Sequence, residues 1–251
     1  MHEAAVSAVQ IPLIVAINKL SSIAPMILHQ MTLRSNQDIA YPNRKGSYIP
    51  DLALRVNREN VFQLEVAFAQ SFEDVRSTMA NRLQDESLLG VLVIKIHETT
   101  KYSSPTKSPT EEDDVPKRDW FAGIQREGRF GTVWFKERAW LHRIEVYVAL
   151  FERGWKDGDD DPLKVRHATL SFTCLSYFIK HAIPENGDFS LSDIDTRLNV
   201  IWQSVTRQCI GQTHPNVQVE EFKVNWNDLR SLLVDAMLDT AHFRYQKWIR
   251  G

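Results

Sequence analysis

The stretch 48–98 constrains the fold most, because its apolar pattern changes from a period of two to a helical period and back again. Apolar residues alternate with others on both sides of a turn at 57–60, which predicts two antiparallel strands. Ser71 then begins a helix, with Asp74 as its capping-box partner, and residues 91–97 predict a further strand. A strand–helix–strand unit places its two strands side by side and parallel, so the sequence predicts a mixed sheet.

The helix after Ser71 has one apolar face, which we expect to pack under the sheet. Its members recur at helical spacing and are Phe72, Val75, Met79 and Leu83. Other segments predict a helix over 4–20, strands over 26–33, 130–136 and 141–151, a strand or short helix over 170–181, and helices over 191–208 and 226–248. The predicted order is helix, strand, strand, strand, helix, strand, followed by more strands and C-terminal helices. This is an α/β fold.

Composition is that of an ordinary globular protein. The 251 residues are 43% hydrophobic and 25% charged, and we expect one domain, 1–251, with a disordered insertion at 99–119 that is rich in Ser, Thr, Pro and acids. A second acidic connector is expected at 154–162. The net charge of −2 argues against a strongly basic, non-specific nucleic-acid binder but leaves room for a local basic patch.

The cysteines and the hydropathy of the chain indicate its cellular compartment. Cys174 and Cys209 stand apart from each other, with no CxxC motif, so neither a structural zinc site nor a disulfide framework is expected. The longest apolar run, 11–17, contains Pro12 and is short for a membrane span, which needs about 20 residues. We therefore expect an intracellular protein, cytoplasmic or nuclear, with no membrane partner.

Asp51 and Glu65 are the candidate metal ligands. If Val56 pairs with Val61 across the turn, Asp51 lies opposite Val66, and a bulge or a one-residue change of register puts both acids on one face. Two neighbouring carboxylates repel each other, and a divalent cation such as Mg²⁺ or Mn²⁺ relieves the repulsion. The alternative is that Asp51 only starts its strand and Glu65 is a solvated or paired outward residue.

The motif around these acids resembles the PD-(D/E)XK nuclease superfamily. Pro50-Asp51 precedes Glu65 in a strand, and 65–71 reads EVAFAQS, similar to the ExGxSQS run of fungal members; weaker echoes lie at 168–178 and 222–233. The resemblance implies a restriction-endonuclease-like core, an αβββαβ mixed sheet flanked by helices, with C-terminal helices. It also implies a Mg²⁺-dependent DNA nuclease in which Asp51 and Glu65 bind the metal.

One motif residue is missing, which leaves two functions open. The family's lysine, two residues after the glutamate, is Ala67 here, and that lysine normally orients the attacking water. Lys95, expected at about the height of Glu65 with outward parity, or Gln70, at the end of the same strand, could replace it. Alternatively Lys95 pairs with an acid on the sheet surface and Gln70 only caps the helix. The chain is then either a nuclease or an inactive nuclease-fold module that binds nucleic acid or protein.

A basic stretch with aromatic residues at 125–143 is the candidate nucleic-acid surface. Its cationic members are Arg126, Arg129, Lys136, Arg138 and Arg143. Such a surface contacts phosphates and stacks bases, and the nuclease resemblance favours DNA over RNA as the partner. The alternative is an edge hairpin with a solvated charged face.

Overall fold

The computed structural model describes residues 1–41, 45–68, 70–106, 114–153, 177–183, 191–210 and 219–250. Its centre is a six-stranded mixed sheet in the order β1-β4-β5-β6-β10-β11. These strands are β1 (Met31–Arg34), β4 (Leu52–Val56), β5 (Glu59–Ala67), β6 (Gly90–Glu98), β10 (Ile144–Glu152) and β11 (Tyr177–Ala182). β5 and β6 run parallel, while every other neighbouring pair is antiparallel. The predicted α/β class and mixed sheet are confirmed.

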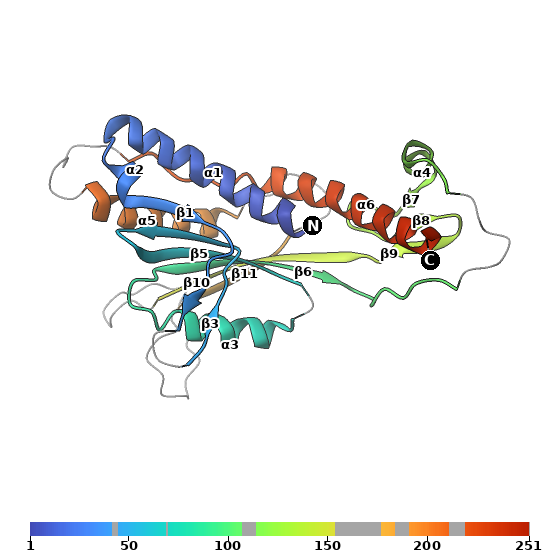
Figure 1. Ribbon diagram of the computed structural model, residues 1–251, viewed down its shortest axis with the longest axis horizontal. Helices are drawn as coiled ribbons and strands as arrows, with labels where there is room; N and C mark the ends of the chain where they lie inside the picture. Colours follow the sequence, from blue (N-terminus) through green and yellow to red (C-terminus); the bar gives the residue numbers. More distant parts are fainter. Residues whose placement is uncertain are drawn as a thin grey trace.

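Helices cover both faces of this sheet. The long helices α1 (His2–Ile23) and α6 (Trp226–Arg250) lie along one side, and α3 (Phe72–Arg82) lies on the other (Figure 1). α5 (Ser192–Ile210) and the four-residue α2 (Ile27–Gln30) pack on the side of α1. Each face has its own apolar cluster, a large one under α1, α5 and α6 and a smaller one under α3. The alternation of strand side chains therefore decides which cluster each residue joins.

The hairpin between β4 and β5 is tighter than the sequence predicts. Its turn holds only Asn57 and Arg58, both with positive φ (50° and 77°), as in the two-residue turns that match strand twist. Val56 consequently pairs with Glu59 rather than with Val61. A register shift next to Leu54 then sets the pairing of the rest of the hairpin.

α3 forms as predicted. The Ser71 hydroxyl accepts a hydrogen bond from the Asp74 backbone N–H, and the Asp74 carboxylate accepts one from the Ser71 backbone N–H, which completes the capping box. Val75, Met79 and Leu83 are buried against the sheet, while Phe72 at the first turn is only half-buried. The predicted apolar stripe is therefore confirmed except at its exposed end.

Three predicted segments differ in the structure. The region 26–33 is strand only from Met31, because α2 precedes it. The predicted strand at 130–136 is shorter, since β8 (Val133–Phe135) lies between β7 (Gln125–Arg126) and β9 (Arg138–Leu141) in a separate small sheet. The ribbon of β2 (Ile39–Ala40) and β3 (Ser47–Tyr48), which packs against Ala53 of β4, was not expected.

The predicted insertion at 99–119 is wrong at its C-terminal end. Residues from Lys117 onward form α4 (Lys117–Gly123), and Trp120 of this helix is completely buried against α6 and the small sheet. Nearby, the Val115 backbone N–H donates to the Tyr245 hydroxyl at 3.0 Å. Positions 107–113, the acidic connector at 154–162 and residues 170–176 of the strand or short helix predicted over 170–181 lie outside the described residues.

α1 is apolar on both of its faces. It is long and apolar enough to span a membrane by length and composition, a test that the core helix of a soluble protein also passes. Seven of its side chains are buried, whereas Ile11, Ile14, Val15 and Ile23 are exposed. The expectation of no membrane partner stays a prediction.

Candidate active site

Asp51 and Glu65 come together at the edge where β4 begins. Because Leu52 pairs with Leu64, the residue before it, Asp51, falls opposite Glu65. The Val66 backbone N–H donates to Asp51 Oδ2 at 2.6 Å, which fixes the carboxylate beside β5. Burial raises the pKa of Glu65, and the negative charge of Asp51 raises it further, although the Arg82 guanidinium opposes both. The register shift next to Leu54 therefore brings the two acids opposite each other, as the sequence predicted for a hairpin with a bulge or a one-residue change of register.

Glu65 has a cationic partner that the sequence reasoning missed. The Arg82 side chain, at the last turn of α3, donates from Nη1 to Glu65 Oε2 at 2.8 Å. The two side chains are 4% and 17% exposed, so this ion pair is nearly withdrawn from water. One signal could have found it, since position 82 shares the helix face of Val75 and Met79, and a charge on a buried face requires a partner.

Asp51 is paired with the first turn of α1. His2 Nε2 and Asp51 Oδ1 share a hydrogen bond of 2.7 Å. Burial alone would lower the pKa of His2, but the hydrogen bond and the charge of Asp51 outweigh it, so the pKa is raised. The sequence carries no signal for this contact, because 49 positions separate the two residues.

Lys95 lies on β6 two residues beyond the position that pairs with Glu65, where it was expected. It pairs with Ala67 rather than with Glu65, and its side chain is 5% exposed beneath α3, so outward parity is wrong. Nζ donates to the Phe68 carbonyl at 3.2 Å and also to the Gln70 carbonyl, and it stands 5.6 Å from the Phe72 ring centroid. The ammonium is therefore next to the strand position at which the superfamily motif has its lysine.

Gln70 contributes its backbone to this arrangement. Its side chain is exposed, and its carbonyl accepts the hydrogen bond from Lys95. The side chain that caps α3 belongs to Ser71, so capping by Gln70 is not needed. Of the four predicted site residues, Asp51 and Glu65 lie opposite each other. Lys95 lies on β6 two residues beyond the position that pairs with Glu65, and Gln70 is exposed between β5 and α3.

The acid pair is a donor set of the kind that Mg²⁺ uses. Magnesium is commonly held by one or two carboxylates, with water and substrate phosphate as its other ligands. Within the described residues, no group of three or more His, Cys, Asp or Glu side chains could hold a metal ion. A metal here would depend on Asp51 and Glu65, and it would have to compete with His2 and Arg82.

The predicted basic surface is divided between exposed and packed cations. Arg129, Lys136 and Arg143 are exposed, while Arg126 is half-buried and Arg138 lies 4.8 Å from the Trp248 ring centroid. Lys136 stands with Glu137 at the tip of the β8–β9 hairpin, where both residues have positive φ. Trp134, the neighbouring aromatic residue on β8, is 38% exposed.

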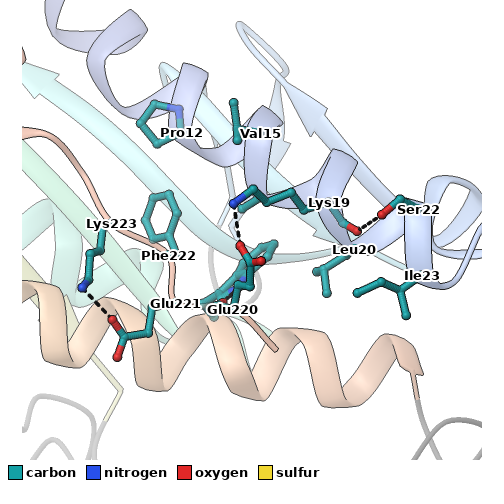
Figure 2. A pocket seen from close by; sticks show the side chains of 12 residues that line it. Pro12, Val15, Lys19, Leu20, Ser22, Ile23, Glu220, Glu221, Phe222 and Lys223 are labelled. Atoms are coloured by element: carbon teal, nitrogen blue, oxygen red, sulfur yellow. Dashed lines mark hydrogen bonds and ion pairs between the residues drawn. The ribbon is translucent and has the colours of Figure 1, made fainter. Parts of the chain in front are cut away.

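A cavity of about 300 Å³ lies on the face of the large sheet that α1 and α5 cover. It opens between α1, α5 and the segment 220–223, with apolar walls that include Val15, Leu20 and Phe222 (Figure 2). Its polar groups are already paired, Lys19 with Glu220 and Lys223 with Glu221. None of the four predicted site residues lines it.

Comparison of the sequence with protein families and with curated proteins finds no match. The likeness to the nuclease superfamily therefore rests on the motif residues themselves, and the function has to be argued from the geometry of the acid pair.

Proposed function

We propose that this protein hydrolyses phosphodiester bonds of nucleic acid, DNA in preference to RNA, on a restriction-endonuclease-like core. One observation carries the proposal, namely that adjacent strands bring Asp51 opposite Glu65 and Lys95 opposite Ala67. Two carboxylates and an ammonium group around one strand end are the groups that metal-dependent phosphodiester hydrolysis requires.

The order of elements supports the same proposal. Apart from the four-residue α2 and the ribbon of β2 and β3, the elements α1, β1, β4, β5, α3 and β6 follow one another as helix, strand, strand, strand, helix, strand. This is the αβββαβ order of the superfamily core, and the helices α5 and α6 come after it.

Each residue has a distinct role in the proposed reaction. Asp51 and Glu65 would hold Mg²⁺ or Mn²⁺, which supplies charge neutralisation at the phosphate and a more acidic water. Lys95 would stabilise the charge that develops on the phosphate, taking over from the lysine that Ala67 replaces. Gln70, exposed between β5 and α3, would contact the water or the phosphate.

A second candidate function is an inactive nuclease-fold module that binds nucleic acid or protein. The observation that favours it is that both acids already have partners inside the protein, Asp51 with His2 and Glu65 with Arg82. A carboxylate neutralised by a neighbouring cation has less need of a metal. In this function Ala67 marks the position at which catalysis was lost.

Cleavage assays distinguish the two functions. We expect the chain to cut single- or double-stranded DNA with Mg²⁺ or Mn²⁺ and not with EDTA, and we expect Asp51→Asn or Glu65→Gln to lower the rate more than about 100-fold. Glu59→Gln, at the exposed start of the same strand, is the matched control and should keep the rate. If no DNA or RNA is cut but nucleic acid or a protein partner is bound, the inactive module is the correct function.

The exposed cations in the loops next to the strands of the small sheet are expected to bind the nucleic-acid backbone. Changing Arg129, Lys136 and Arg143 together to glutamine should weaken DNA binding and lower the slope of log affinity against log salt by about 2–3, close to one for each phosphate contact. Fluorescence anisotropy at several salt concentrations measures the slope. Arg207→Gln, an exposed cation near the end of α5, is the control, and an unchanged slope in the triple variant would exclude this surface.

A further inference from the structure

The Arg82 guanidinium is held in a fixed position beside Glu65. Its Cζ lies 4.4 Å from the centre of the Tyr48 ring, and the Tyr48 hydroxyl accepts a hydrogen bond of 2.8 Å from Gln63 Nε2. Gln63 is completely buried on the same face of β5 as Glu65. Stacking on an anchored aromatic ring leaves the guanidinium little freedom, so its charge stays next to Glu65.

Arg82 is also poorly solvated. Its side chain is 4% exposed, and within the described part of the chain its Nε is buried without a hydrogen-bond partner. Arginine does not lose its proton in proteins, so this positive charge is permanent. An enclosed cation beside a carboxylate interacts with it more strongly than a surface cation does, because less water screens the pair.

We infer that Arg82 is a resident counter-ion that occupies Glu65 in place of a metal, so that the Asp51–Glu65 pair stays closed to divalent cations until Arg82 is displaced. The inference rests on the proposed metal-dependent function, because it concerns access of the metal to the same two acids. Arg82 acts through Glu65 and is therefore a positioning residue rather than a catalytic one. It determines how tightly, and whether, the acid pair binds a cation.

Calorimetric titration of the full chain with MnCl₂ tests this inference. Arg82→Gln is expected to bind Mn²⁺ at least about 10-fold more tightly than the wild type, because it removes a fixed positive charge beside the metal. Arg76→Gln, an exposed arginine on the same helix, is the matched control and should bind as the wild type does. Adding Glu65→Gln to Arg82→Gln should abolish the gain, which assigns it to Glu65.

A second variant tests the inference if Arg82→Gln does not fold. Arg82→Lys keeps the charge but lacks the planar group that stacks on Tyr48, so it should bind Mn²⁺ with an affinity between those of the wild type and Arg82→Gln. Circular dichroism confirms that each variant is folded before titration.

The outcomes separate this inference from the proposed function. If the wild type binds Mn²⁺ and neither Arg82 variant binds more tightly, the counter-ion role is wrong and the metal-dependent function stands. If only an Arg82 variant binds, the counter-ion role is supported and the wild-type site is closed. If no variant binds at millimolar Mn²⁺, the acid pair is not a metal site and both proposals are wrong.

Discussion

Replacing Lys95 with methionine is expected to slow phosphodiester cleavage by about 10²- to 10³-fold without weakening Mn²⁺ binding. The ammonium group stands at the end of β5, where it donates to the carbonyls of Phe68 and Gln70. Removing one donor that stabilises charge in a transition state typically costs this much in rate. Methionine has a similar length and packs against apolar neighbours such as Phe72. The measurement is the rate at saturating metal and substrate.

Lys101→Met provides the matched control for this prediction. Lys101 is exposed just after β6, so removing its charge should leave the rate within about twofold of the wild type, as for surface changes in general. Full activity in Lys95→Met would show that Lys95 has only a structural role, and Gln70→Ala would then be the variant to examine.

Met79→Ala should lower the free energy of unfolding by about 2–5 kcal/mol, the usual cost of a cavity left by a buried methionine. Met79 is 1% exposed and belongs to the apolar cluster that joins α3 to β5, β6 and β10. Because α3 also carries Arg82, its loosening should weaken the ion pair with Glu65. Chemical denaturation followed by circular dichroism measures the change.

Arg76→Ala on the exposed face of α3 is the comparison, and it should change stability by no more than about 0.5 kcal/mol. An unchanged denaturation midpoint in Met79→Ala would mean that α3 does not cover the sheet in solution.

The elements of the sheet were predictable because their apolar patterns are strong. The alternation through β4 and β5, the capping box at Ser71 and the stripe through Met79 all depend on neighbouring residues, and the structure confirms them. The exact register was not predictable, because the turn uses Asn57 and Arg58 at positive φ without the glycine that usually marks such turns. The shift by which Asp51 meets Glu65 follows from that turn and from the irregularity next to Leu54.

The site was predictable only in part, because its charge partners come from distant elements. Glu65 and Lys95 stand out in the sequence as polar residues within apolar strands. Their surroundings depend on how α1 and α3 pack, since α1 brings His2 to Asp51 and α3 brings Arg82 to Glu65. Sequence periodicity assigns a residue to a face of its own element, but it does not say which residue of another element covers that face.

The central claim is that Asp51 and Glu65 form one divalent-cation site. The most direct measurement is a crystal structure of the protein grown with Mn²⁺, in which anomalous scattering locates the ion. We predict a single peak within about 2.0–2.6 Å of carboxylate oxygens of both residues, the range for hard divalent cations and oxygen ligands. The account is contradicted if no anomalous peak lies between the two acids, in Arg82→Gln as well as in the wild type.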